Sequence, residues 1–391
     1  MGETDRAVLL TGATGFVGME VLARYVERTD RELYVLVRAG DDAEAAARVR
    51  TTMGALYGSD EAYAGRVTAV AADIERDGLG LTPERRASLA ARVSDIVHSA
   101  ASVSFSLPLE ESRQVNVAGT RRLLEFAHEA QSRGGLTRFA YVSTAYVAGT
   151  HEGEFREDQL DVGQGFRNAY ERSKFEAETL VREKADRLPV QIFRPSIIVG
   201  EQASGWTASF NVLYAPLKAF ARGALRVLPA HRSAPVDVVP VDYVADAIFA
   251  LATGPVESRA ETFQLVAGRE ATTVGRLASL GARHFGRRPP RVFPPRLYRR
   301  LLHPLLMRGL PKRSRRALAR SEVFFPYFTM RVAFDNRRAR ARLERQGIRV
   351  SSVERYLGRL IDFASAADWG RRSVSRSAAR GSVTARGARP R

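Results

Sequence analysis

The sequence predicts a doubly wound parallel α/β sheet, and three observations lead to this fold class. Short apolar runs typical of buried strands recur along the first 265 residues, and helical patterns separate them. A glycine-rich turn directly follows the first of these runs. Hydroxyl and small residues follow later runs, at the sheet edge where such folds bind ligands. Alternating strands and helices favour a parallel sheet with helices on both faces.

The glycine-rich turn over residues 11–18 reads TGATGFVG and follows the apolar run 7–10. Three glycines between a strand and a helix let the backbone approach a pyrophosphate, whose charge then lies at the helix N-terminus. The spacing is G-x-x-G-x-x-G, and glycine-rich turns also serve tight packing. On the dinucleotide reading this is a Rossmann-type site, and its expected cofactor contacts are Gly12, Thr14, Gly15, Phe16, Val17 and Gly18.

The second apolar run, residues 32–38, ends in Arg38. In a doubly wound sheet this position faces the adenosine ribose, where a carboxylate suits the 2′-hydroxyl of NAD and an arginine suits the 2′-phosphate of NADP. Arg48, in the helical pattern that follows, offers a second phosphate contact. The sequence therefore predicts NADPH as cofactor, and an exposed arginine at a strand end is the alternative reading of Arg38.

The third run, residues 67–72, ends at Asp73 and Ile74, which we expect beside the adenine. A cap at the strand end is the alternative reading of this pair. The fourth run ends at His98, which we interpret as structural, and continues into the small residues Ser99, Ala100 and Ala101, which allow close approach of the cofactor.

Asn116 opens or lies within a long helical pattern downstream of these strands. We expect its side chain to hold a backbone carbonyl or a water molecule near the site. An asparagine that simply caps a helix start is an equally good reading.

The fifth run, residues 138–144, ends in the hydroxyl residues Ser143 and Thr144. Tyr170 and Lys174 follow at helical i,i+4 spacing and share one face. We predict that the Lys174 ammonium lowers the phenol pKa of Tyr170 from about 10, which makes Tyr170 a general acid. Thr144 and Tyr170 then donate to the oxygen on which charge develops, and Lys174 also binds the nicotinamide ribose. Ser143 is a predicted cofactor contact.

The sixth run, residues 190–194, leads into Pro195, Ser196 and Ile197, which we expect to border the nicotinamide. The stretch after it, residues 201–235, is too apolar for an ordinary loop and suits a substrate lobe.

Composition excludes several classes of site and predicts a cytoplasmic protein. The chain has no cysteine, and its 6 histidines lack metal-ligand spacing, so no metal centre is predicted. No long apolar window or secretory signal is present. The net charge of +18 comes mostly from the C-terminal part, where residues 271–321 and 371–391 contain no acidic residue.

We expect three regions in the chain. Residues 1–266 form the dinucleotide-binding domain, with substrate-lobe insertions at about 150–169 and 201–235. Residues 267–370 form a basic, mainly helical substrate lid, and residues 371–391 form a disordered basic tail. Leucines at 297, 301, 302, 305, 306 and 310 form an amphipathic stripe, which suits an anionic membrane, an acyl chain or ordinary packing.

Together these motifs resemble the extended short-chain dehydrogenase/reductases, in particular their fatty acyl-CoA reductase and thioester reductase branch, also called male-sterility-like. The general resemblance rests on TGATGFVG, Thr144 and the Tyr170/Lys174 pair. The resemblance to the branch rests on VLVRAGDDAEAAARV at 35–49, NVAGT at 116–120 and VDVVPVDYVADAI at 236–248. It implies NADPH-dependent reduction of a fatty acyl thioester, carried by CoA or by an acyl-carrier protein, to an aldehyde and in a second round to an alcohol.

Two other functions fit the same residues. One is an extended dehydrogenase or epimerase that acts on a sterol or a nucleotide-sugar, although Arg38 argues against many NAD-dependent epimerases. The other is a non-catalytic NADP-binding protein that contacts a membrane through its basic lobe. The sequence shows no pattern of aromatic and basic residues for stacking bases, so nucleic acid is not a predicted partner.

Overall fold

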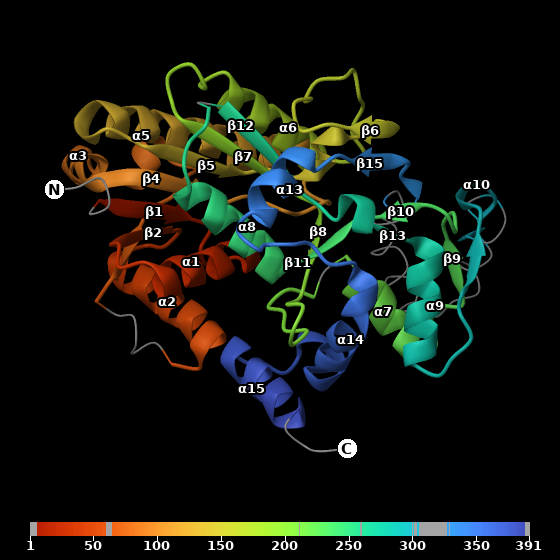
Figure 1. The fold of residues 1–391 in the computed structure, drawn as a ribbon. Helices are drawn as coiled ribbons and strands as arrows, with labels where there is room; N and C mark the ends of the chain where they lie inside the picture. Colours follow the sequence, from red (N-terminus) through yellow and green to blue (C-terminus); the bar gives the residue numbers. More distant parts are fainter. Residues whose placement is uncertain are drawn as a thin grey trace.

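A computed structural model describes residues 6–59, 65–210, 212–258, 260–298, 300, 303–304, 327 and 329–387. Its centre is a parallel seven-stranded sheet of order β12-β7-β5-β4-β1-β2-β3 (Figure 1). The strand order reverses between β1 and β4, which is the switch point where such sheets bind ligands. The doubly wound fold predicted from the sequence is confirmed. The strands are β1 (Ala7–Thr11), β2 (Leu33–Val37), β3 (Val67–Ala71), β4 (Val93–His98), β5 (Arg138–Val142), β7 (Val190–Pro195) and β12 (Ala260–Leu265).

Helices cover both faces of this sheet, and each layer has its own apolar core. On one face lie α1 (Phe16–Arg28), α2 (Asp42–Tyr57) and α8 (Val241–Thr253). On the other face lie α3 (Pro83–Arg92), α5 (Gly119–Gly134) and α6 (Ala169–Arg182). The inner strands are buried along their whole length because helices pack on both sides, which explains their continuous apolar sequences.

A second lobe is built from segments that lie far apart in the chain. Short strand pairs join these segments: β8 with β11, β9 with β14, β10 with β13, and β6 with β15. The first three pairs contribute to the lobe, whose own core is formed with α7, α9 and α14. The elements are β6 (Gly153–Phe155), β8 (Ile197–Val199), α7 (Tyr214–Ala221), β9 (Val227–Pro229), β10 (Pro235–Val236), β11 (Val238–Pro240), β13 (Thr272–Thr273), α9 (Val274–His284), β14 (Arg291–Phe293), α10 (Pro295–Leu297), β15 (Val332–Phe334), α13 (Arg337–Glu344) and α14 (Leu357–Ala366).

The C-terminal tail differs from its predicted disorder. Residues Arg376–Gly387 form helix α15, which packs beside α2 (Figure 1). Arg376 is only 2% exposed and pairs with the carboxylates of Glu20 and Glu27 on α1. The tail lacks large apolar residues, but buried carboxylates elsewhere in the fold give its arginines partners. Composition alone does not reveal such partners.

The predicted leucine stripe lies mostly outside the described residues. Leu297 belongs to the described part and is 42% exposed, whereas Leu301, Leu302, Leu305, Leu306 and Leu310 do not. Within the described ranges, no helix is both long enough and apolar enough to span a bilayer.

Candidate active site

The glycine turn between β1 and α1 has the close backbone contacts of a dinucleotide cradle. Gly12 has φ +73°, and a Cβ there would lie 2.5 Å from the backbone nitrogen of Ala100. A Cβ at Gly18 would lie 2.1 Å from the carbonyl oxygen of Gly12. The Gly15 amide donates to that same carbonyl at 2.8 Å and closes the turn. Only glycine fits at positions 12 and 18, so the N-terminus of α1 stays open to a phosphate group.

A cavity of about 740 Å³ extends from this turn along the carboxyl ends of the strands. Its volume lies within the range usual for cofactor and ligand sites, roughly 300–1,000 Å³. Many predicted site residues meet here, namely Gly12, Gly15, Phe16, Val17, Gly18, Ala101, Thr144, Tyr170, Ser196 and Ile197. The cradle and the candidate catalytic hydroxyls therefore share one space.

Thr144 and Tyr170 form the hydroxyl pair predicted from the sequence. Thr144 follows β5 and is 3% exposed, and its Oγ1 accepts a hydrogen bond from the Tyr146 amide at 3.3 Å. Tyr170 lies in the first turn of α6. Asn168 caps the N-terminus of this helix, because its Oδ1 accepts a hydrogen bond from the Glu171 amide at 2.9 Å. The Thr144 hydroxyl donates to the Pro195 carbonyl at 3.4 Å, and Thr144 and Tyr170 line the same cavity. Both hydroxyls can therefore reach the same substrate oxygen.

Lys174 occupies a different place from the predicted one beside the phenol. It is 2% exposed, its Nζ donates to the Val142 carbonyl at 2.8 Å, and it lies 4.3 Å from the ring centroid of Tyr141. Burial lowers the pKa of Lys174 to about 7. Burial also raises the pKa of Tyr170 to about 12, against a lowering by Thr144. The predicted lowering of the Tyr170 pKa by Lys174 is thus wrong, because burial raises this pKa and the Lys174 ammonium is held by the Val142 carbonyl.

Asn116 holds the backbone beside the cavity, which agrees with the first of the two interpretations given for it from the sequence. It lies in a π-helical turn, Gln114–Ala118, between α4 (Leu109–Arg113) and α5, so it does not cap a helix start. Its Oδ1 accepts from the Ser102 amide at 2.8 Å, and its Nδ2 donates to the Ser102 carbonyl at 3.1 Å and to Ser173 Oγ at 2.9 Å. These bonds fix the segment after Ala101 against α6.

Ser196 is held in the cavity wall by a buried carboxylate. Its Oγ donates to Asp237 Oδ1 at 2.5 Å, and Asp237 also accepts from the amides of Ala267 at 2.7 Å and Gly268 at 2.9 Å. Burial raises the pKa of Asp237. Pro195, Ser196 and Ile197 were predicted to border the nicotinamide. Asp237 holds Ser196 in place within this segment, which the sequence did not reveal.

His98 is structural, as predicted. Its ring nitrogens lie 2.7 Å from Thr11 Oγ1 and 3.1 Å from Thr120 Oγ1. Burial lowers its pKa to about 3, so the ring is neutral. It joins β1 to β4 and α5 beneath the cavity.

Ser143 is not placed for a side-chain contact with the cofactor. Its hydroxyl donates to the buried carboxylate of Glu178 at 2.6 Å, and Glu178 pairs with Arg194 at 2.6 Å. The alternation of side chains along the end of β5 directs neighbouring residues to opposite sides, so Thr144 lines the cavity and Ser143 does not. This prediction is corrected.

The predicted contacts for the adenosine half lie at the ends of β2 and β3, outside the cavity lining. Arg38 is paired with Glu75 at 2.9 Å, and its side chain is 71% exposed. Arg48 donates to the Arg38 carbonyl. Asp73 accepts from the Glu75 amide at 2.9 Å, and Ile74 packs against Gly119. Arg38 and Arg48 thus lie close together, and both remain candidates for a phosphate contact.

Three aromatic residues around Tyr170, and Trp206 beside the glycine turn, were not predicted as site residues. The ring of Phe105 lies 5.4 Å from Tyr170 and 5.5 Å from Tyr327, and Tyr327 lies 5.1 Å from Tyr146. The Tyr327 hydroxyl accepts a hydrogen bond from Asn168 Nδ2 at 2.8 Å. Trp206 packs against Phe16 of the glycine turn, with ring centroids 6.3 Å apart. Tyr327 follows Tyr170 by more than 150 residues, so only its place in the segment YFTMRVAF could have suggested it.

The described residues contain no group of three or more histidine, aspartate or glutamate side chains arranged to hold a metal ion.

Comparison with known proteins identifies the family. The profile of the Male sterility protein family matches residues 10–248, which contain the glycine turn, Thr144 and the Tyr170/Lys174 pair. The chain belongs to this family. It is an extended short-chain dehydrogenase/reductase of the thioester reductase branch, as the motifs predicted.

Two curated relatives and one solved structure illustrate the relationship. The chain is 36% identical over 284 residues to an isonitrile lipopeptide synthase of Streptomyces coeruleorubidus, covering 71% of this chain and 18% of that protein. It is 28% identical over 292 residues to the fatty acyl-CoA reductase wat of Drosophila melanogaster, covering 66% and 56%. The terminal R domain of the myxalamid PKS-NRPS pathway superposes with a TM-score of 0.81 at 27% identity, covering 96% and 94%. The chain thus matches only part of the length of these two curated relatives.

Proposed function

We propose that this member of the male sterility family reduces an acyl thioester to an aldehyde with NADPH. The observation that carries the proposal is the single cavity that joins the glycine cradle to Thr144 and Tyr170. A carbonyl group that reaches these hydroxyls lies beside the end of the site where the nicotinamide belongs. The apolar and aromatic residues around it favour a lipid-like acyl group over a sugar diphosphate.

The residues present fit NADPH. Gly12 and Gly18 leave the space at the start of α1 that a Cβ would fill, which suits the pyrophosphate. Arg38 follows β2, and Arg48 reaches the Arg38 carbonyl from α2. The two side chains supply positive charge for a 2′-phosphate, although Arg38 must then exchange Glu75 for that phosphate. Bound NADPH supplies the hydride.

The side chains act on the oxygen of the thioester carbonyl. As hydride adds to the carbonyl carbon, Thr144 donates a hydrogen bond to that oxygen and Tyr170 transfers its proton, which gives a hemithioacetal. When the carbon–sulfur bond breaks, Tyr170 takes the proton back and the carbonyl of the aldehyde forms. The departing thiolate takes a proton from solvent. In this proposal the Lys174 ammonium does not lower the Tyr170 pKa, and its role is to bind the nicotinamide ribose.

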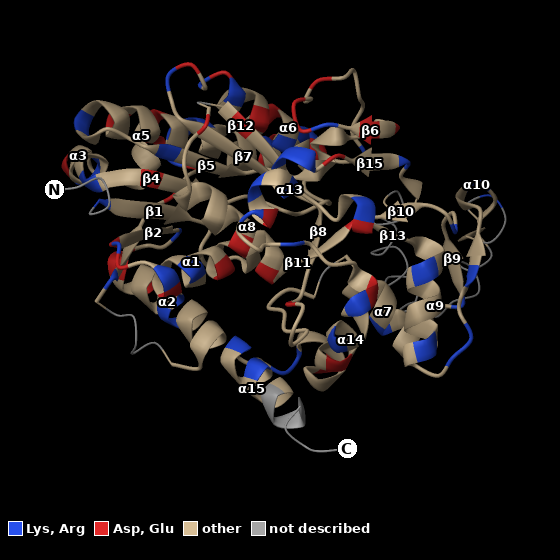
Figure 2. Cartoon of the chain, in the orientation of Figure 1, with Lys and Arg blue, Asp and Glu red and all other residues tan. Residues whose placement is uncertain are grey.

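We further propose that the thioester arrives on a phosphopantetheine arm, carried by CoA or by an acyl-carrier protein. Lys and Arg positions occur on both α7 and α9 of the second lobe (Figure 2). Burial and the nearby guanidinium groups of Arg222 and Arg371 lower the pKa of Lys218, and Arg287 reaches the end of α7 at Gly223. This cationic cluster of Lys218, Arg222, Arg287 and Arg371 suits the phosphates of either donor.

The test is NADPH oxidation by the purified protein with octanoyl and palmitoyl thioesters of CoA and of an acyl-carrier protein, with products identified by mass spectrometry. We expect aldehyde with NADPH and much slower reaction with NADH. Tyr170→Phe should lower kcat about 10²- to 10⁴-fold, because it removes the general acid. Turnover that is unchanged in this variant, or an absence of turnover with both CoA and carrier-protein thioesters, would contradict the proposal.

A further inference from the structure

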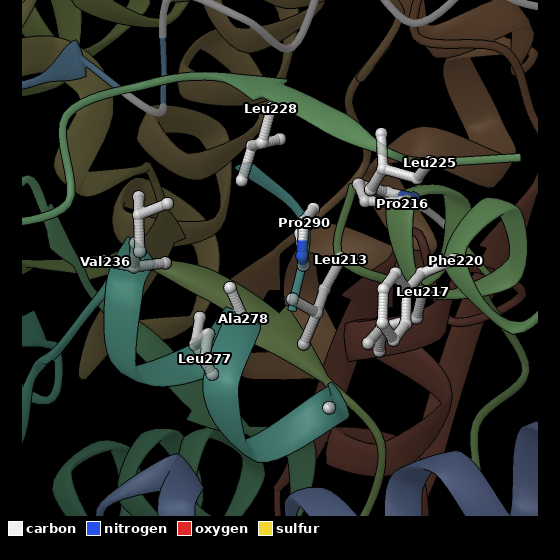
Figure 3. Close-up of a pocket in the computed structure, with 12 residues that line it drawn as sticks. Leu213, Pro216, Leu217, Phe220, Leu225, Leu228, Val236, Leu277, Ala278 and Pro290 are labelled. Carbon is white, nitrogen blue, oxygen red and sulfur yellow. The ribbon is translucent and has the colours of Figure 1, made fainter. Parts of the chain in front are cut away.

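The second lobe contains a pocket of about 70 Å³ between α7, α9, β9 and β10. No charged side chain lines it. Figure 3 shows side chains of α7 and α9 that face the same space. The pocket is lined by Leu213, Pro216, Leu217, Phe220, Leu225, Leu228, Val236, Val274, Leu277, Ala278, Gly281 and Pro290.

A further pocket of about 80 Å³ lies between this apolar pocket and the catalytic cavity. It shares Tyr146, Ile197 and Tyr327 with the catalytic cavity and Val236 with the apolar pocket. The three spaces therefore follow one another, from the hydroxyls of Thr144 and Tyr170 to the core of the second lobe.

A thin layer of chain separates the catalytic cavity from the apolar pocket. Val212 lines the cavity, whereas the next residue, Leu213, lines the apolar pocket. Ile197 packs both against the aromatic cluster around Tyr327 and against the core of the second lobe. Ile197 lines both the catalytic cavity and the middle pocket, and Val236 lines both the middle pocket and the apolar pocket.

We propose that the apolar pocket receives the distal alkyl segment of the acyl group, and that Ile197 and Val236 form the passage to it. This inference rests on the proposed thioester reduction. A cavity needs about 10–15 Å³ to hold one water-sized group, so each of the two pockets accommodates several methylene groups. In the apolar pocket a polar or charged substituent would lose its hydrogen bonds, whereas an alkyl chain gains from leaving water. The pocket thus selects chains of medium length over short ones.

The test fills the pocket from α9. Ala278→Phe places a ring among the lining side chains, and Ala215→Phe makes the same change at an exposed position of α7 that does not line the pocket. Butanoyl, octanoyl and dodecanoyl pantetheine serve as substrates, so that the test does not depend on CoA or a carrier protein. We expect the ratio of kcat/KM for dodecanoyl to butanoyl pantetheine to fall at least tenfold in Ala278→Phe and to stay unchanged in Ala215→Phe. An equal loss for all three lengths would overturn the inference.

A binding measurement separates this inference from the proposed reaction. Calorimetry with 1-dodecanol and 1-butanol needs no turnover, and far-UV circular dichroism establishes that each variant is folded. We expect 1-dodecanol to bind the unmodified chain and Ala215→Phe, and to bind Ala278→Phe at least tenfold more weakly. If no thioester is reduced but this pattern holds, the proposed function fails and the pocket remains an alkyl site. Equal binding of 1-dodecanol to all three proteins would overturn the alkyl site.

Discussion

Lys174 is the residue whose environment differs most from the sequence-based expectation. Its ammonium is buried against the Val142 carbonyl and the Tyr141 ring, and burial lowers its pKa to about 7. The charge that the proposed mechanism requires is therefore present below about pH 7 and is lost as the pH rises through that value. In the free protein, Lys174 therefore carries its charge mainly below about pH 7.

We accordingly predict that kcat/KM for NADPH falls as the pH rises above about 7, because this quantity reports on groups in the free enzyme. Lys174→Arg should move the falling limb to higher pH at reduced activity, since a guanidinium keeps its charge. The measurement is a pH profile of initial rates from pH 5 to 9. A flat profile over this range in the unmodified protein would contradict the role of the Lys174 charge.

The glycine turn gives a second prediction at the residue scale. Gly18→Ala places a Cβ 2.1 Å from the Gly12 carbonyl oxygen. This oxygen belongs to the backbone, so the clash can be relieved only by distorting the glycine turn. We expect NADPH affinity to fall at least tenfold, measured by quenching of tryptophan fluorescence. Gly54→Ala is the matched control, because a Cβ at this position of α2 meets nothing within 4 Å. This control should leave affinity unchanged and stabilise the protein by about 0.5–1 kcal/mol.

At the scale of elements, the sequence predicted the strands of the central sheet much better than the second lobe. Buried parallel strands leave continuous apolar runs, and the glycine turn and the Tyr170/Lys174 spacing are local patterns. By contrast, β6 and β15 have three residues each, and their pairing joins residues 153–155 to residues 332–334. No local pattern encodes such a pairing, so the strand patterns do not predict that Tyr327 lines the same cavity as Tyr170.

Asn168 connects helix α6 to this long-range contact. Its Oδ1 caps the helix that carries Tyr170, and its Nδ2 donates to the Tyr327 hydroxyl. We predict that Asn168→Ala lowers the free energy of unfolding by about 1 kcal/mol, the usual value of an N-cap, and also lowers kcat. Asn168→Asp keeps the cap but loses the donor to Tyr327, so it should retain stability while kcat/KM still falls. Urea unfolding and steady-state kinetics distinguish the two contributions, and equal stability of all three proteins would refute the cap.

At the scale of the whole molecule, the C-terminal helix is joined to the dinucleotide-binding domain through charge. Arg376 pairs with Glu20 and Glu27 of α1, and Arg380 pairs with Glu201 in the loop that contains Trp206. Trp206 in turn donates to the Val374 carbonyl at 2.9 Å and packs against Phe16 of the glycine turn. The last residues of the chain thus support the cofactor cradle, although their composition is typical of disordered tails.

Arg376→Met tests this support. Removing one partner of a buried ion pair leaves an uncompensated charge and costs about 3–5 kcal/mol. Glu20 keeps Arg24 as a partner, so we expect a loss near the lower end, about 3 kcal/mol. Arg372→Met, the same substitution at an exposed position, should change stability by less than about 0.5 kcal/mol. Thermal unfolding measures both variants; equal melting temperatures for the two would mean that α15 does not contribute to the stability of the folded domain.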